Sequence, residues 1–375
     1  MSKRANGEGS IHQRKDGRWC ASIGIGKGKR KHFLGRTRGE VSKHLNTALD
    51  EREKGTLVAG PRQTVDQFFK QWLDAVRPSL RPRTFVRYEQ FVRLHVVPDL
   101  GTLPLTKVTP QHLQRLYTSR LDAGLSPTTV NHLHALIHKA LSNAVRWGVV
   151  NRNVADLVDP PRNRHFEIAT LTAEQARAFL DAAAGNRLEA LFVLAVTTGM
   201  RQGELLGLRW RDLDLDAGAL QIRGSMQATP DGLRIMEPKT PGSRRQVALS
   251  KQPIEALRRH RVAQAAERLR IGAAWVDREL VFCSAAGRPI TASALRRSYE
   301  PLLERAGLPR MRFHDLRHTS ATLLLGRGVH PKVVSEMLGH TRISTTLDLY
   351  SHVSMTMQQQ AAEAFDAILA APISR

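Results

Sequence analysis

The stretch HDLRHTSATLLLGRG, residues 314–328, places two histidines and an arginine directly before an apolar run. On a helix, residues three apart lie on one face, so His314 and Arg317 can reach one phosphate group together. Taken alone, such a pair is more often part of a solvated surface. His314 and His318, four residues apart, could alternatively bind zinc, but no glutamate follows the first histidine and no third ligand is apparent.

Two further stretches supply groups suited to phosphodiester chemistry, TGMRQGELLGLRW at 198–210 and LGHTRISTTLDLYSHV at 338–353. Phosphoryl transfer develops negative charge on the equatorial oxygens, which fixed cations must stabilise. Without a metal these cations should be arginines, because a planar guanidinium can hold two phosphate oxygens. A nucleophile and a proton donor complete such a site. In the second of these stretches, His340 is followed ten residues later by Tyr350.

A lysine in an arginine-rich chain is the candidate proton donor. The chain has 44 Arg and 13 Lys, and after Lys139 only Lys239, Lys251 and Lys332 remain. Lysine can release a proton near neutral pH, whereas arginine cannot. Lys251 follows Ser250 at a predicted helix start and is interpreted as a surface residue. Lys239, at a predicted strand turn, therefore fits a general acid.

Together these residues resemble the tyrosine recombinase, or phage integrase, family, in order, spacing and flanking apolar pattern over residues 170–352. The matching positions are Arg201, Lys239, His314, Arg317, His340 and Tyr350. The resemblance implies that Tyr350 is the nucleophile and forms a 3′-phosphotyrosyl link to DNA. It implies that Arg201 and Arg317 hold the non-bridging oxygens of the scissile phosphate.

The remaining roles also follow from the resemblance. His314 and His340 are expected to hydrogen-bond the phosphate, with His314 as the general base, and Lys239 is expected to protonate the departing 5′ oxygen. Glu204, three residues after Arg201, is expected to orient that arginine, with an ordinary exposed glutamate as the alternative. The family needs no cofactor or metal, because the phosphotyrosyl bond stores the energy of the broken phosphodiester. It works as a homotetramer on two DNA duplexes.

Residues 1–60 are expected to form a small β-sheet and a helix that resemble the arm-type DNA-binding domain of integrases. Strands are predicted over Ser10–Arg14 and Arg18–Ile25, because Asp16-Gly17 is a strong hairpin signal, and over Arg30–Leu34. A lysine- and arginine-rich β unit can enter a DNA groove, and a structural domain with a basic surface is the alternative. The residues expected to contact DNA are Arg14, Lys15, Arg18, Lys27, Lys29, Arg30 and Lys31.

The rest of the chain is predicted to form two further domains, which makes the protein an α+β multidomain protein. Residues 61–165 read as a helical domain similar to the core-binding domain of the family, its apolar stripe beginning at Phe68 and Phe69. Residues 166–375 read as a mainly α-helical catalytic domain with a small antiparallel sheet and a C-terminal tail. Whether that tail packs on its own domain or on a neighbouring protomer stays open.

Charge supports a nucleic-acid partner along the whole chain. Lys and Arg number 57 and Asp and Glu 34 in 375 residues, a net charge of +23. Residues 1–60 carry 14 basic and 6 acidic residues, residues 61–165 carry 15 and 7, and the remainder 28 and 21. Such a surplus favours a polyanionic partner over the substrates of an ordinary neutral metabolic enzyme. We therefore expect double-stranded DNA, at core and arm attachment sites, as the partner.

Several other classes are disfavoured. The longest apolar run, Ala190–Val196, is far below the roughly 20 residues of a membrane span, and no apolar stretch follows the basic N-terminus as in a signal peptide. Two cysteines are too few for a disulfide framework. We expect a cytoplasmic, nucleoid-associated protein without a membrane partner. Asp212, Asp214 and Asp216 alternate along a predicted strand end, and we predict no metal there.

Four functional interpretations remain. The first is an integrase of a phage or mobile element, with an excisionase and a host DNA-bending protein as possible accessory partners. The second and third are a chromosome-dimer-type resolvase and a type IB topoisomerase. The fourth is a DNA-binding regulator without catalysis, which degraded site residues would indicate.

Overall fold

The structure is a computed structural model that describes residues 9–24, 30–53, 63–162, 169–229, 232–237, 244–340, 342–350 and 366. The chain divides into one unit over residues 1–165 and a second over residues 166–375. The boundary proposed between residues 60 and 61 lies outside the described residues. The division into three domains therefore stays a prediction.

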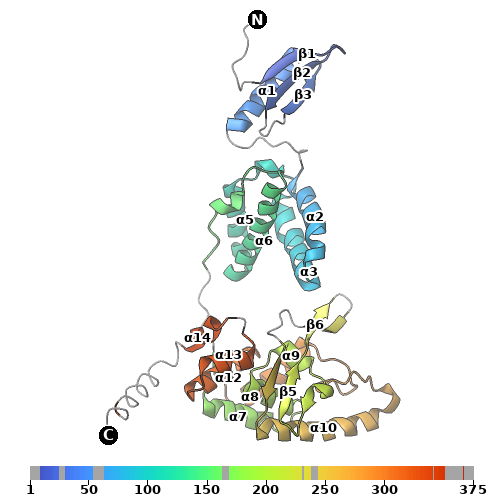
Figure 1. The fold of residues 1–375 in the computed structure, drawn as a ribbon, viewed down its shortest axis with the longest axis vertical. Helices are drawn as coiled ribbons and strands as arrows, with labels where there is room; N and C mark the ends of the chain where they lie inside the picture. The colour runs from blue at the N-terminus through green and yellow to red at the C-terminus, as the bar shows by residue number, and fades with distance from the viewer. Residues whose placement is uncertain are drawn as a thin grey trace, which may run out of the picture. The chain divides into compact units, whose positions relative to one another are not determined.

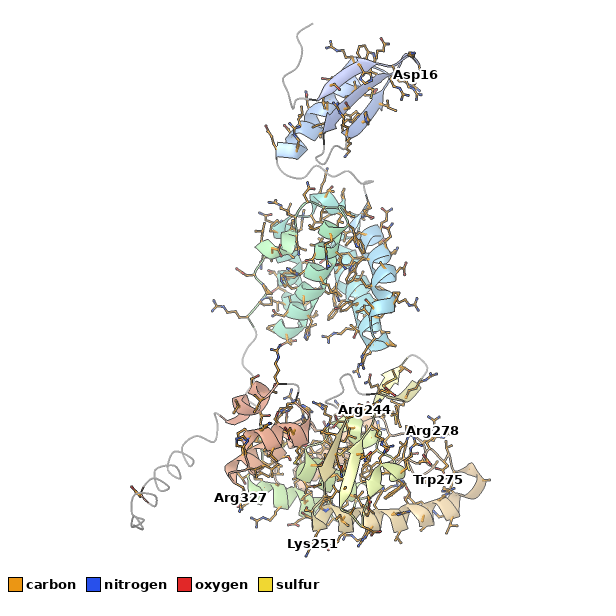
Figure 2. The ribbon with its side chains drawn as sticks, in the orientation of Figure 1. Asp16, Arg244, Lys251, Trp275, Arg278 and Arg327 are labelled. Atoms are coloured by element: carbon orange, nitrogen blue, oxygen red, sulfur yellow. The ribbon has the colours of Figure 1, made fainter. Side chains whose placement is uncertain are left out.

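A three-stranded antiparallel sheet opens the first unit (Figure 1). Its strands are β1 (Ser10–Gln13), β2 (Trp19–Gly24) and β3 (Arg30–Gly35), and the helix α1 (Arg38–Glu53) follows them. The turn between β1 and β2 uses Gly17 at φ 78°, and the N–H of Arg14 donates to the carbonyl of Arg18 at 2.8 Å. Asp16 is labelled at this turn in Figure 2. Ala21 and Ile23 of β2 are fully buried in a small core that α1 completes.

Helices form the remainder of the first unit. They are α2 (Val65–Val76), η1 (Arg77–Ser79), α3 (Pro82–Phe91), the π-helical turn η2 (Val92–Val96), α4 (Val97–Leu100), η3 (Leu105–Lys107), α5 (Pro110–Asp122), α6 (Pro127–Arg146) and η4 (Val154–Leu157). Thr64 begins α2 with a capping box, accepting from the N–H of Gln67 at 3.3 Å. Phe68, Phe69 and Trp72 are buried, so the predicted apolar stripe is core.

The helical path that begins with α3 changes its geometry before Pro98. α3 ends at Phe91 and the chain continues as the π-helical turn η2. Pro98, in the first turn of α4, has no N–H with which to continue a regular ladder. The wider turn accommodates this missing donor.

The second unit is mainly helical. Its helices are α7 (Ala173–Ala183), α8 (Glu189–Thr198), α9 (Gln202–Leu206), η5 (Trp210–Asp212), α10 (Lys251–Ile271), η7 (Gly272–Ala274), α11 (Ala292–Arg305), α12 (Asp315–Gly326), α13 (Pro331–Leu338) and α14 (Ser344–Tyr350). Its strands are β4 (Leu213–Asp214), β5 (Ala219–Ile222), β6 (Ser225–Thr229), β7 (Gly232–Met236) and β8 (Arg245–Ala248). In Figure 1, α12, α13 and α14 lie together, and each of the three packs against the other two.

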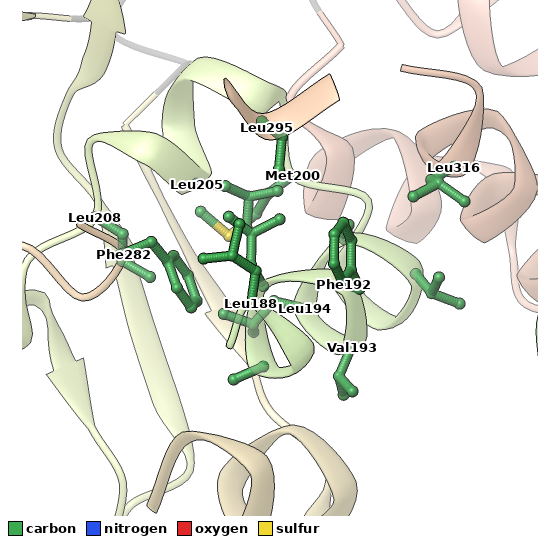
Figure 3. Packing of buried hydrophobic residues seen from close by; sticks show 14 of the residues in the cluster. Leu188, Phe192, Val193, Leu194, Met200, Leu205, Leu208, Phe282, Leu295 and Leu316 are labelled. Carbon is green, nitrogen blue, oxygen red and sulfur yellow. The ribbon is translucent and has the colours of Figure 1, made fainter. Parts of the chain in front are cut away.

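The core of the second unit surrounds α8. The apolar run at 190–196 is buried on every side of that helix. Figure 3 shows Phe192, Leu194, Met200 and Leu205 pointing into one cluster. Met200 and Leu205 flank the start of α9, so core packing holds the backbone of Arg201 from both sides.

The sheet of the second unit is divided in two. One small antiparallel sheet is predicted for this part of the chain, but the structure forms β5 in the sheet β4-β5-β8 and β6 in a separate hairpin with β7. The division falls at Gly224, where a Cβ atom would approach the side chain of Ile235 to 2.5 Å.

No helix in the described part of the chain is long and apolar enough to cross a membrane.

Candidate active site

Arg201 is placed by a tight turn between two helices. Gly199 ends α8 in the left-handed conformation, at φ 60°, and Arg201 is the residue before α9. A Cβ at residue 199 would collide with Leu338 of α13 and approach Ser320 of α12. Only glycine therefore allows α8 to meet both helices so closely.

Glu204 is buried and holds Arg201 at two points. Its side chain is 5% exposed, so the alternative of an ordinary exposed glutamate does not apply. The backbone N–H of Arg201 donates to Oε2 and Nη1 of Arg201 donates to Oε1, each at 2.9 Å. Burial by itself raises the pKa of Glu204, but hydrogen bonds and charge from Arg245 and Arg201 outweigh it and lower that pKa. The carboxylate is therefore ionised at neutral pH.

Arg317 lies in the first turn of α12 and is 3% exposed. Its Nη1 donates to the carbonyl of Gly199 at 2.8 Å. Its Nη2 is buried and has no hydrogen-bond partner in the part of the chain that the structure describes. Burial, followed by the charge of Arg201, lowers the pKa of Arg317 to about 9. An anion beside this guanidinium would accept a hydrogen bond from Nη2 and would raise the pKa of Arg317 again.

The two candidate phosphate-binding histidines are kept neutral. His314 precedes α12, and its ring lies 5.1 Å from that of His318, edge to face. Although more than a third of its surface stays exposed, loss of water around it, then the charges of His318 and Arg317, lower its pKa to about 4. Partial burial, then the charges of Arg317 and Arg201, lower the pKa of His340 to about 4.

His340 also links two helices of the site. It follows Gly339, which ends α13 in the left-handed conformation at φ 69°. A hydrogen bond of 2.8 Å joins its Nδ1 to Oγ1 of Thr346, a fully buried residue of α14. The carbonyl of Gly339 accepts from Nη2 of Arg201 at 2.8 Å. The start of α9 and the helix that ends at Tyr350 are thus connected through this turn.

The remaining predicted residues are described only in part. Tyr350 is the last residue of α14 in the structure, and its side chain lies outside the described residues, as do Lys27, Lys29 and Lys239. In the N-terminal sheet, Arg14 and Arg18 are exposed and both pair with Asp16, at 3.8 and 3.0 Å. Arg30 and Lys31 lie on β3, and Lys15 is exposed at the β1–β2 turn.

Neither metal alternative is supported. Asp212 lies 3.5 Å from Nε of Arg223, and Asp216 pairs with Arg258 at 2.9 Å. Oδ1 of Asp214 accepts the backbone N–H of Ala217 at 2.8 Å, so each of the three carboxylates has an ion-pair or hydrogen-bond partner within the protein. Over the described ranges, no three His, Cys, Asp or Glu side chains are grouped so that they could hold a metal ion.

One residue of the site was missed by reasoning from the sequence. Arg245, the first residue of β8, is 7% exposed and forms an ion pair with Glu204 at 3.0 Å. The sequence signal, Arg244-Arg245 at a predicted strand start, is weak because arginine is abundant throughout the chain.

Comparison with known proteins identifies the family of the chain. Residues 169–357 match the phage integrase family, and residues 64–121 match the N-terminal SAM-like domain of phage integrases. A tyrosine recombinase XerC-like protein of Caldanaerobacter subterraneus subsp. tengcongensis is 34% identical over 90% of this chain and 92% of its own. An integrase of Streptomyces ambofaciens is 30% identical over 98% of this chain and 97% of its own.

A solved structure agrees in fold. The lambda integrase tetramer bound to a Holliday junction aligns with a TM-score of 0.57 and 18% identity, over 88% of this chain and 95% of that chain. The chain belongs to the phage integrase family of tyrosine recombinases, whose members cleave and rejoin DNA. The predicted fold class and site-specific recombinase activity are thereby confirmed.

Acid is expected to destabilise the second unit, residues 166–375. The pKa values of His314 and His340 are about 4 in the folded protein, against about 6.5 in an unfolded chain. The unfolded chain therefore binds more protons between these pH values, and the free energy of unfolding falls as pH decreases from about 6.5 to about 4. Urea denaturation across this range measures the fall.

The double variant His314→Gln/His340→Gln should show a smaller fall than the wild type. His12→Gln in the N-terminal sheet serves as the control and should leave the fall unchanged. A double variant with the same pH dependence as the wild type would contradict the expectation.

Proposed function

We propose that this chain is the integrase of a phage or another mobile element, acting through a phosphotyrosyl intermediate at Tyr350. Family membership supports the reaction class. The observation that carries the assignment of residues is Nη2 of Arg317, a buried guanidinium nitrogen without a partner among the described residues. A buried donor of this kind is stabilised when an anionic oxygen accepts its hydrogen bond. The scissile phosphate is the proposed acceptor.

The proposed chemistry uses the arginines as a clamp. Arg201 and Arg317 hold the two non-bridging oxygens and stabilise the charge that develops on them. Oη of Tyr350 attacks the phosphorus, the bond from phosphorus to the 5′ oxygen breaks, and the 3′ phosphate becomes bonded to the tyrosine. Rejoining is the reverse step with a 5′ hydroxyl of the other duplex. The phosphotyrosyl bond conserves the bond energy, so no metal or cofactor is required.

Proton transfer is assigned to a histidine and a lysine. His314 accepts the proton of Tyr350, which requires the neutral imidazole that its lowered pKa maintains at neutral pH. His340 donates a hydrogen bond to the phosphate while Thr346 engages its other ring nitrogen. Lys239 donates a proton to the departing 5′ oxygen. Glu204 acts through Arg201, which it holds at backbone and side chain.

The proposed partners follow from the charge and the family. Double-stranded DNA is bound at core sites and, through the N-terminal sheet, at arm sites. A homotetramer is proposed, supported by the lambda integrase tetramer on a Holliday junction. An excisionase and a host DNA-bending protein are the proposed accessory partners, and the nucleoid in the cytoplasm is the proposed place of action.

A chromosome-dimer-type resolvase is the alternative to be tested, because one relative is named a tyrosine recombinase and not an integrase. The basic N-terminal sheet favours the integrase, since a second DNA-reading unit serves arm sites. Recombination of a pair of dissimilar attachment sites indicates an integrase, and recombination of identical sites alone indicates a resolvase.

Tyr350→Phe should abolish the covalent adduct on a nicked suicide duplex and leave DNA affinity within about threefold of the wild type. The variant lacks only the oxygen that attacks phosphorus. Denaturing electrophoresis of labelled DNA measures the adduct. Tyr299→Phe is the matched control, since its buried hydroxyl has no partner in the described residues and its loss breaks no hydrogen bond. An undiminished adduct with Tyr350→Phe would exclude the assignment.

Deletion of residues 1–60 should remove arm-site binding and preserve adduct formation at the core site. This segment has 14 basic and 6 acidic residues. Each lost phosphate contact reduces the slope of log affinity against log salt concentration by about 0.9. Loss of about four contacts should therefore reduce the slope by roughly 3 to 4, as fluorescence anisotropy at several salt concentrations can measure. Substitution of Arg14, Lys15 and Arg18 by glutamine should produce a smaller change in the same direction. An unchanged slope would contradict the role of this segment.

A further inference from the structure

Arg245 has every guanidinium nitrogen engaged inside the protein. Its Nε donates to the carbonyl of Met337 at 2.6 Å. Its Nη1 and Nη2 donate to Oε1 and Oε2 of Glu204 at 3.2 and 3.0 Å. With 7% of the side chain exposed, Arg245 is closed off from DNA. Whatever it contributes to the reaction must pass through Glu204 or through the end of α13.

The C-terminal end of α13 packs closely against the guanidinium group of Arg245. Gly339 adopts φ 69°, and a Cβ there would approach Nη1 of Arg245 to 2.7 Å. The backbone of residues 337–340 therefore lies directly against Arg245. The same turn accepts a hydrogen bond from Arg201 at the carbonyl of Gly339 and presents His340. Arg245 thus sets the position of a turn that two proposed catalytic residues share.

Charge gives Arg245 a second effect. Glu204 is one carboxylate between two guanidinium groups: Oε1 accepts from Nη1 of both arginines, and Oε2 accepts from the N–H of Arg201 and Nη2 of Arg245. Arg245 compensates the negative charge of Glu204. The positive charge of Arg201 then remains available to a substrate anion. Without Arg245, the buried carboxylate would be neutralised by Arg201 itself.

We propose that Arg245 is a positioning residue of the strand-transfer reaction, which keeps Arg201 and His340 in place and keeps the charge of Arg201 free for the scissile phosphate. The proposal rests on the roles assigned above to Arg201 and His340. Arg245 touches neither phosphate nor leaving group. Its loss should therefore slow cleavage and leave DNA binding nearly intact.

Single-turnover cleavage of a nicked suicide duplex, together with the Kd for the same DNA, tests this role. Arg245→Gln should cleave at least about 100-fold more slowly, comparable to the loss of one oxyanion donor, with Kd within about threefold. Arg245→Lys, which keeps the charge and loses the paired hydrogen bonds, should recover part of the rate. Arg244→Gln is the matched control, because Arg244 is 60% exposed and pairs only with Glu237 among the described residues (Figure 2 labels Arg244). It should cleave at the wild-type rate.

A double variant separates positioning from mere support of the fold. In Arg245→Gln/Glu204→Gln no buried carboxylate is left to capture Arg201, so the double variant should cleave faster than Arg245→Gln. If Arg245 and Glu204 only supported the fold, the losses of cleavage rate in the single variants Arg245→Gln and Glu204→Gln would multiply in the double variant. Multiplied losses would overturn the proposal, as would Arg245→Gln at the wild-type rate.

Two further comparisons cover the cases in which Arg245→Gln does not fold or the proposed function itself is wrong. If Arg245→Gln fails to fold by circular dichroism, Arg245→Lys decides: slower cleavage at unchanged Kd supports the proposal, and the wild-type rate overturns it. The wild-type enzyme tests the proposed function separately. Absence of a Tyr350 adduct in the wild type would contradict the proposed function, whereas an adduct with unaffected Arg245 variants would contradict only the positioning role.

Discussion

The candidate site depends on one buried carboxylate. Glu204 lies between Arg201 and Arg245, and four hydrogen bonds converge on its two oxygens. Two guanidinium groups held close together repel each other, and a carboxylate between them offsets that repulsion. The carboxylate of Glu204 offsets the repulsion between Arg201, at the start of α9, and Arg245, at the start of β8. One of the two positive charges remains uncompensated.

Several features of the site prepare it to receive an anion. Burial and neighbouring cations lower the pKa values of Arg317, His314 and His340. Each group is therefore less stable in its charged form than it would be in water. A phosphate oxygen among them, as proposed, favours the charged forms. In the proposed reaction, such a site stabilises the phosphodiester most strongly where its negative charge increases, which is in the transition state.

Much of this arrangement could be predicted from the sequence, and the reason is local spacing. His314 immediately precedes α12, whose first turn contains Arg317, and Glu204 lies three residues from Arg201, so each relation exists within a single turn. Arg245 could not be found in this way, because its partners Glu204 and Met337 lie 41 and 92 residues away. The division between β5 and β6 also escaped prediction, since it depends on contact of Gly224 with a neighbouring strand. Long-range contacts leave no periodic trace in a sequence.

The central claim is that Arg201 and Arg317 act by neutralising the charge of the scissile phosphate. The most direct test compares Arg317→Ala with the wild type on two suicide duplexes, one with the normal phosphate and one with a neutral methylphosphonate at the scissile position. On the phosphate, the variant should form the tyrosine adduct at least about 100-fold more slowly. On the methylphosphonate, the deficit should shrink to a few-fold, because the charge that Arg317 stabilises is missing. An equal deficit on both duplexes would contradict the account.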